Sequence, residues 1–202
     1  MTEEMHGALV EDPAFSIRLE EPTPAHRAAV EDYAAELRVD GGELNGTGGH
    51  DLCAMAYDEW MAAVRAEARG EGLPEGWVPA TTFLMVRPAD GQVVGSISVR
   101  HSIDNPYLRL YAGHIGYMVR PSARRRGYAH QALTLACRYA RDVLGIERVM
   151  LGCDQDNEGS WRTIKSCGGV LDRKFTLPAD GCGDPSECGA AVCTWWIDTA
   201  RA

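Results

Sequence analysis

The segment Gly113–Gln131, GHIGYMVRPSARRRGYAHQ, holds the residues whose types and spacing best suit a chemical site. A short apolar run from Ile115 to Val119 ends before Pro121, and a cluster of arginines, Gly127 and a helical pattern follow. The first turn of a helix has backbone N–H groups without intrahelical acceptors, and the helix dipole adds positive charge there. Because glycine has no Cβ, a ligand can approach the backbone closely. The segment therefore predicts a site for pyrophosphate.

This segment resembles the acetyl-CoA signature of the GNAT superfamily of N-acetyltransferases. The run Arg124-Arg125-Arg126-Gly127-Tyr128-Ala129 matches the pattern Gln/Arg-x-x-Gly-x-Gly/Ala, and Val119-Arg120-Pro121 stands where that family ends its fourth strand. Downstream, Asn157, Ser160 and Gly168-Gly169 resemble the family's asparagine, small residue and helix-ending glycine. The local motifs are similar to a bacterial branch of predicted acetyltransferases. The resemblance covers Phe83–Ile197 well and residues 1–80 poorly.

The resemblance implies an α/β (α+β) fold with one domain. It implies a mixed central sheet of about seven strands, about four flanking helices, and a V-shaped splay between strands 4 and 5. We expect residues 1–13 to form a disordered tail and residues 14–202 to form a single acetyl-CoA-dependent N-acetyltransferase domain.

The same resemblance implies how acetyl-CoA binds as a co-substrate. The pantetheine arm would lie in the splay and pair with backbone groups, and the Val119 N–H would polarise the thioester carbonyl. Backbone amides from Arg125 to Ala129, rather than arginine side chains, would make most of the pyrophosphate contact. The predicted cofactor-binding residues are Met118, Val119, Arg124, Arg125, Arg126, Gly127, Tyr128, Ala129, Asn157 and Ser160.

The implied reaction is direct attack of a primary amine of a small molecule or peptide on acetyl-CoA, in a ternary complex. A base must remove a proton from the ammonium group. His114 on the central strand is the first candidate because an unperturbed histidine has a pKa near neutrality. His101 is the second candidate, and Asp154 is another. Each histidine can equally be a structural residue.

The general acid is less defined. Many members of the family carry a tyrosine seven residues after the asparagine, and this chain has Ile164 there. Tyr117, Ser160, Cys153 or water could replace it, or CoA thiolate could leave without an acid. Tyr117 could also be a packing residue. The isoleucine supports an alternative function, a catalytically weak acyl-CoA-binding sensor or structural subunit.

Composition narrows the class of protein. The net charge of −9 disfavours nucleic acid as a partner, although the arginine cluster leaves local anion binding open. No apolar run approaches the ~20 residues that span a membrane, and the acidic N-terminus lacks the features of a signal peptide. We expect a cytoplasmic enzyme with an amine acceptor as its partner, no nucleic acid and no membrane; a homodimer is left open.

The seven cysteines predict no metal site. Cys182, Cys188 and Cys193 lie close together, but no Cys-x-x-Cys pair or nearby histidine completes a zinc site. Reduced thiols are the expected state in the cytoplasm, and a labile Cys182–Cys188 disulfide is left open.

Periodicity and turn signals give the expected order of elements. The glycine-rich stretch Asp40–Asp51 is expected to be a flexible connector or, alternatively, a lid on the acceptor side. The expected helices are Ala25–Val39, Leu52–Arg69, Gly127–Leu144 and Asn157–Cys167; the expected strands are Phe15–Leu19, Thr81–Val86, Val93–Arg100, Leu110–Arg120, Arg148–Cys153, Val170–Leu177 and Val192–Asp198.

Overall fold

Five antiparallel strands form the larger sheet of the computed structural model, which describes residues 9–41, 44–178 and 188–202. In spatial order they are β1 (Leu9–Val10), β2 (Arg18–Glu20), β3 (Ala80–Arg87), β4 (Gln92–Arg100) and β5 (Ile115–Val119). The predicted hairpin is confirmed: β3 and β4 pair around a turn at Gly91, which has a φ of 71° that glycine adopts without strain.

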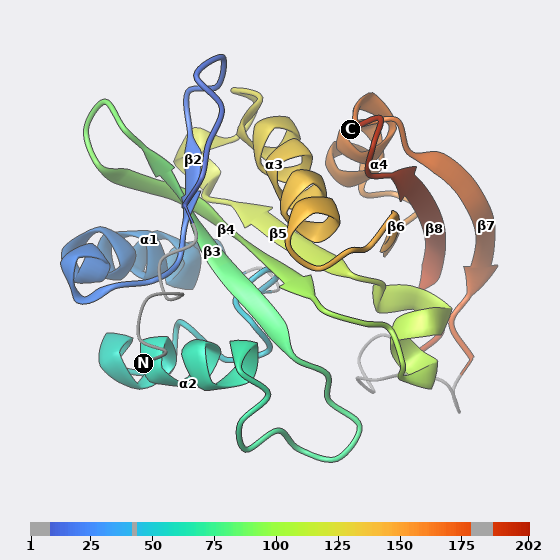
Figure 1. Ribbon diagram of the computed structural model, residues 1–202, viewed down its shortest axis with the longest axis horizontal. Coiled ribbons are helices and arrows are strands. Elements are labelled where there is room, and N and C mark those ends of the chain that lie inside the picture. The colour runs from blue at the N-terminus through green and yellow to red at the C-terminus, as the bar shows by residue number, and fades with distance from the viewer. Residues whose placement is uncertain (1–8, 42–43, 179–187) are drawn as a thin grey trace.

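Three further strands form a second antiparallel sheet in the order β6 (Arg148–Asp154), β8 (Ala191–Asp198) and β7 (Val170–Thr176). The two sheets meet where His114 N donates to Met150 O at 2.7 Å, beside an isolated bridge between Gly113 and Leu151. Beyond this point β5 and β6 belong to different sheets (Figure 1). The predicted splay is thus confirmed, but the predicted single mixed sheet is two antiparallel sheets.

Helices cover both faces of the larger sheet (Figure 1). Helices α1 (Arg27–Asp40) and α2 (Tyr57–Ala68) share one apolar cluster with β3 and β4. Helix α3 (Tyr128–Asp142) covers the other face, and α4 (Glu158–Ser166) lies beside it. Adjacent residues of β3 therefore face two different cores: Phe83 packs with the α3 cluster and Leu84 with the cluster of α1 and α2. This explains why β3 is apolar on both faces.

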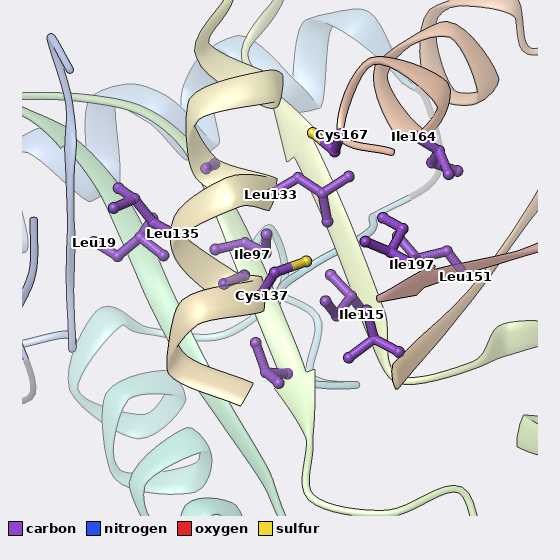
Figure 2. Packing of buried hydrophobic residues seen from close by; sticks show 14 of the residues in the cluster. Leu19, Ile97, Ile115, Leu133, Leu135, Cys137, Leu151, Ile164, Cys167 and Ile197 are labelled. Carbon is purple, nitrogen blue, oxygen red and sulfur yellow. The ribbon is translucent and has the colours of Figure 1, made fainter. Parts of the chain in front are cut away.

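The α3 cluster also joins the two sheets. Figure 2 shows Leu133 and Cys137 of α3 pointing into the same core as Ile115, Leu151 and Ile197. These five side chains are at most 3% exposed. Apolar burial on this scale fixes α3, and with it the residues that begin the helix, relative to β5 and β6.

Three boundaries differ from the prediction. The expected strand Leu110–Arg120 is a short π-helix at Leu108–Ala112 followed by β5. The break falls at Gly113, which has a φ of 63° and whose Cβ would lie 2.2 Å from the Met150 carbonyl oxygen. Helix α2 begins at Tyr57 rather than Leu52. Residues 9–13, expected in the tail, contain β1 and an ion pair from Asp12 to α3.

Candidate functional site

The beginning of α3 is built as an anion cradle. Gly127 precedes the helix with a φ of 79°, and Arg125 has a φ of 62°, the one positive φ outside glycine among the described residues. This conformation exposes backbone N–H groups: those from Arg125 to Ala129 have no acceptor within the described part of the protein. A Cβ at Gly127 would meet no protein atom within 4 Å, so the cradle is open to a ligand. Such a turn is suited to a phosphate group.

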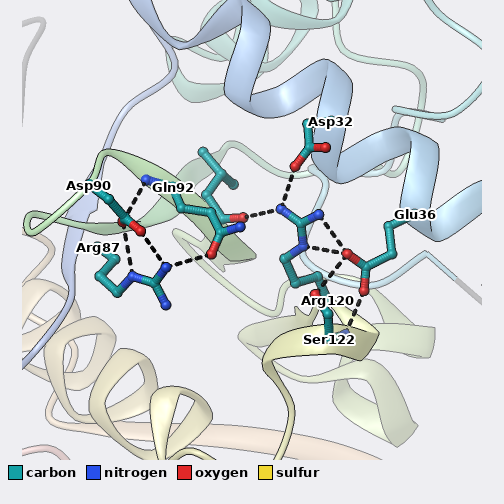
Figure 3. Close-up of polar contacts among 8 residues, drawn as sticks. Asp32, Glu36, Arg87, Asp90, Gln92, Arg120 and Ser122 are labelled. Atoms are coloured by element: carbon teal, nitrogen blue, oxygen red, sulfur yellow. Dashed lines mark hydrogen bonds and ion pairs between the residues drawn. The ribbon is translucent and has the colours of Figure 1, made fainter.

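The four clustered arginines differ in whether they form ion pairs within the protein. Arg120 is 5% exposed and pairs with two carboxylates of α1, Glu36 at 2.6 Å and Asp32 at 2.8 Å (Figure 3). Arg124 pairs with Asp40 at 2.8 Å. Neither Arg125 nor Arg126 forms an ion pair with any described residue. Two of the arginines therefore hold the turn in place, and the other two can add positive charge to the cradle.

A cavity of about 840 Å³, called here the first cavity, extends from this cradle into the gap between β5 and β6. The structure brings together at its wall every predicted cofactor-binding residue except Arg126, and Tyr117 as well: Tyr117, Met118, Val119, Arg124, Arg125, Gly127, Tyr128, Ala129, Asn157 and Ser160. A cavity of this size that includes an anion cradle suits an extended ligand that ends in phosphate groups.

The open edge of β5 offers backbone groups to this cavity. In the register with β4, the backbone N of Arg120 donates to Val94 O at 3.0 Å. Because successive residues of a strand turn to opposite edges, Met118 also faces β4, whereas Tyr117 and Val119 face the gap. The Val119 N–H therefore faces the gap, and its role at the thioester stays a prediction. The Met118 backbone groups, which were expected to pair with the ligand, face β4 instead, and the backbone groups of Tyr117 face the gap.

Helix α4 forms the opposite wall. The Asn157 side chain accepts from the backbone N of Ser160 at 3.0 Å, which is an ordinary N-cap. The Tyr117 hydroxyl lies 3.1 Å from Ser160 Oγ, so β5 and α4 meet at these two hydroxyls. Ile164 is fully buried in the core. Burial raises the pKa of Tyr117 and raises the pKa of Cys153 to about 12, so both side chains are protonated at neutral pH.

Neither predicted histidine lines either of the two cavities described in this section. His114 is 6% exposed, and its Nδ1 accepts from the backbone N of Met150 at 2.9 Å. Burial, aided by the nearby Arg100 charge, lowers the pKa of His114 to about 4. His101 lies 2.9 Å from Thr81 Oγ1, and burial lowers its pKa. A role for either as the base stays a prediction that this geometry does not support.

A second cavity, of about 490 Å³, lies on the side of β5 that faces α2. Residues 44–49, called here the 44–49 segment, form one wall, and Trp77 and Val78 form another. The described part of the glycine-rich stretch thus lies on the wall of a cavity, and its role as a lid stays a prediction. The two cavities share four lining residues, Asn45, Arg100, Tyr107 and Gly116, so they adjoin at β5.

The second cavity contains an acidic residue that the sequence prediction missed. Glu67 of α2 is 6% exposed, and burial raises the pKa of its carboxyl to about 8, against a smaller opposing effect of the Arg100 charge. The missed signal is its position: Glu67 falls on the stripe of Tyr57, Trp60 and Val64, whose spacing marks the buried face of α2. A glutamate on the buried face of a helix is rare unless its carboxyl is paired or belongs to a functional site.

The sequence also led to predictions about a disulfide, a metal site and membrane-spanning helices. Cys193 is a free thiol and Cys188 is disulfide-bonded, while Cys182 lies outside the described residues. Over residues 9–41, 44–178 and 188–202, no group of three histidine, cysteine or acidic side chains is placed to hold a metal ion. In the same ranges no helix has the length and apolar character to cross a membrane.

Comparison with solved structures shows the same fold in several acetyltransferases. The ribosomal-protein-S5-alanine acetyltransferase from Vibrio fischeri superposes with a TM-score of 0.67 at 13% identity, covering 95% of this chain and 97% of that one. RimL, a ribosomal L7/L12 alpha-N-protein acetyltransferase solved with coenzyme A, gives a TM-score of 0.65 at 16% identity, covering 95% and 98%. The microcin C7 self immunity acetyltransferase, solved with acetyl-CoA and AMP, gives 0.65 at 14%, covering 94% of each.

Sequence comparison gives the family. No curated protein matches the chain. Residues 11–170 match the family model described as the acetyltransferase (GNAT) domain, which is most of the chain and includes the cradle, β5, β6 and α4. With the fold and the cradle as the structure has them, this chain belongs to the GNAT acetyltransferase family.

Proposed function

We propose that the protein transfers an acetyl group from acetyl-CoA to a primary amine of a small molecule or peptide, by direct attack in a ternary complex. The observation that carries the proposal is the cradle: unpaired N–H groups from Arg125 to Ala129 open on a cavity that follows the edge of β5. The solved relatives with coenzyme A or acetyl-CoA support this choice of co-substrate. The second cavity supplies space for an acceptor on the other side of β5.

The residues of the first cavity fit the parts of acetyl-CoA. The cradle and the charges of Arg125 and Arg126 would hold the pyrophosphate, and the edge of β5 would pair with the pantetheine arm. The Val119 N–H would stabilise the negative charge that develops on the thioester oxygen as the amine attacks. Attack forms a C–N bond and breaks the C–S bond.

Tyr117 is the proposed acid for the departing thiolate. Its hydroxyl faces Ser160 in the wall of the first cavity, and burial keeps it protonated. It comes from β5, whereas the position on α4 where the family often has a tyrosine is the buried Ile164. The Tyr117 hydroxyl on β5 can therefore serve in place of the tyrosine hydroxyl that α4 lacks.

Two measurements test the proposal. Calorimetry with acetyl-CoA should show binding, and a panel of primary amines should release free CoA thiol, with the acetylated amine identified by mass spectrometry. Binding without turnover on any amine would favour the sensor instead. Absence of binding would overturn both functions, because both depend on the cradle.

A further inference from the structure

We propose that the second cavity is the acceptor site for a compact cationic primary amine, and that Glu67 binds the ammonium group and removes its proton. The inference rests on the proposed acetyl transfer and adds to it the acceptor class and the base.

Polar atoms of Glu67 and Thr82 that lack hydrogen-bond partners indicate where the ammonium group of a ligand would bind. Glu67 Oε2 and Thr82 Oγ1 are both buried and have no hydrogen-bond partner among the described residues, and neither has His50 Nε2, which lies 3.5 Å from Glu67 Oε2. The Glu67 and Thr82 atoms are near Gly48, whose Cβ would lie 2.8 Å from the first atom and 2.6 Å from the second. Burying such atoms unpaired is unfavourable. An ammonium group offers three N–H donors and a positive charge, which is the chemistry that the Glu67 carboxylate in the cavity wall can accept.

The carboxyl of Glu67 is the group in this part of the second cavity that would attract an amine. Among the described residues, His50 Nε2 lies 3.5 Å from Glu67 Oε2, and the charge of the Arg100 guanidinium on β4 acts on the Glu67 carboxyl. Burial lowers the pKa of His50, so this ring is uncharged at the pH at which Glu67 ionises and does not neutralise the carboxylate. Arg100 donates to the Gly113 carbonyl at 3.0 Å and lines both cavities.

Burial makes Glu67 a suitable proton acceptor. An ordinary carboxylate, with a pKa of about 4.3, is a poor base for an alkylammonium of pKa about 10.4. The pKa of Glu67, raised to about 8 by burial, leaves a much smaller gap. The Arg100 charge where the cavities adjoin disfavours an ammonium there and favours the neutral amine. The proton is therefore removed before the nitrogen reaches the thioester.

The proton balance closes without another reactant. R–NH₃⁺ and the Glu67 carboxylate give R–NH₂ and the carboxylic acid. The amine nitrogen then bonds to the thioester carbon and the C–S bond breaks. Tyr117 donates its proton to the thiolate sulfur, and the second proton of the amine passes from the nitrogen to the Tyr117 oxygen. Glu67 returns its proton to solvent. The products are the amide, the CoA thiol and one proton.

The size and lining of the cavity favour a small molecule. About 490 Å³ lies within the range of roughly 300–1,000 Å³ typical of small-molecule sites. Trp77, Tyr107, Leu108 and Val78 supply apolar surface beside Glu67. We therefore infer an acceptor with one ammonium group on a compact, partly apolar carrier.

The test compares Glu67→Gln with Glu59→Gln. Glu59 is on the solvent side of the same helix, so its substitution matches the change in charge but leaves the cavity intact. Turnover is measured as CoA thiol release with compact primary amines and with peptide N-termini, from pH 6 to 10. Acetyl-CoA affinity is measured by calorimetry for each protein.

We expect Glu67→Gln to lower kcat/KM at pH 7.5 for compact amines at least about 100-fold with acetyl-CoA affinity unchanged. The limb of the pH profile with a pKa near 8 should also disappear, and Glu59→Gln should match the unmodified protein. No turnover by the unmodified protein overturns the proposed function, and this inference with it. Turnover that Glu67→Gln retains within threefold overturns this inference alone. Turnover of peptide amines but not compact amines overturns the acceptor class.

Discussion

The two cavities on either side of β5 are built from different material. The first is made chiefly of backbone: the N–H groups at the beginning of α3 and the open edge of β5. The second depends on side chains, above all Glu67, Trp77 and Arg100, which come from separate segments. Any residue supplies an N–H, so the first cavity requires a conformation, whereas the second requires particular functional groups. Changes in shape should therefore affect the first cavity most, and changes in charge the second.

Gly127→Val should produce the largest effect, because it changes the shape of the cradle. The added side chain enters space that is open in the protein and would hold the pyrophosphate, and the φ of 79° is strained for valine. We expect affinity for acetyl-CoA to fall at least about 100-fold, measured by calorimetry.

Gly145→Val is the matched control, since Gly145 follows α3 with a φ of 69° and a Cβ there also meets nothing within 4 Å. It should lower the melting temperature by a similar amount and leave affinity unchanged. Equal losses of affinity in the two variants would show that strain, rather than the cradle, explains the result.

Tyr117→Phe should lower kcat about tenfold without changing affinity for acetyl-CoA, because it removes the proposed proton donor. Tyr33→Phe is its control: the Tyr33 hydroxyl also lies 3.1 Å from a serine Oγ, that of Ser96, but it is away from both cavities. Each variant should lose about 1 kcal/mol of unfolding free energy. A loss of kcat in both would assign the effect of Tyr117→Phe to packing.

Local signals account for what the sequence predicted well. The cradle, the β3–β4 hairpin and the Asn157 cap each depend on residues adjacent in the chain. Glycine at a positive φ and an asparagine before a helix are recognisable without knowledge of the rest of the fold. The backbone-built first cavity was therefore largely predictable.

The features that the sequence did not predict depend on contacts between residues far apart in the chain. His114 was placed on the central strand, but its partner Met150 is 36 residues away in the second sheet, and that contact buries the ring. The pattern of α2 could have marked Glu67 as buried. Whether it faces a cavity depends on the 44–49 segment and Trp77, which local periodicity does not position. The side-chain-built second cavity was for this reason missed.

Gly116→Ala tests whether the amine passes from the second cavity to the first at Gly116, a residue that lines both. Gly116 lies on the same face of β5 as Met118, which packs toward α1 and α2, so a Cβ would point to the second cavity, 3.4 Å from Gly46 N. We expect kcat/KM for the amine to fall about tenfold, because the methyl group narrows the passage. Affinity for acetyl-CoA, measured on the same variant, should stay within about twofold. If acetyl-CoA affinity falls while the amine is unaffected, the passage has been placed on the wrong side of β5.

The last expected effect is on stability rather than on binding or turnover, and Glu67 is again the residue concerned. Its pKa of about 8 in the folded protein is above the ordinary value of about 4.5, so the folded state binds this proton more tightly than the unfolded state. The stability this contributes is complete below about pH 4.5 and is lost as the pH rises through about 8. Glutamine carries no such charge. Glu67→Gln should therefore be more stable than the unmodified protein at pH 9, by about 4–5 kcal/mol.

Thermal or urea unfolding at pH 5 and pH 9 measures this difference, with Glu59→Gln as the control on the exposed side of α2. The gain for Glu67→Gln should be present at pH 9 and largely absent at pH 5, and Glu59→Gln should show no such change. A variant that gains stability at high pH while it loses acetyl transfer would show that the Glu67 carboxyl serves turnover at a cost to stability when it is charged. If Glu67→Gln is less stable at both pH values, the carboxyl is paired within the fold, and the second cavity loses the group that distinguishes it.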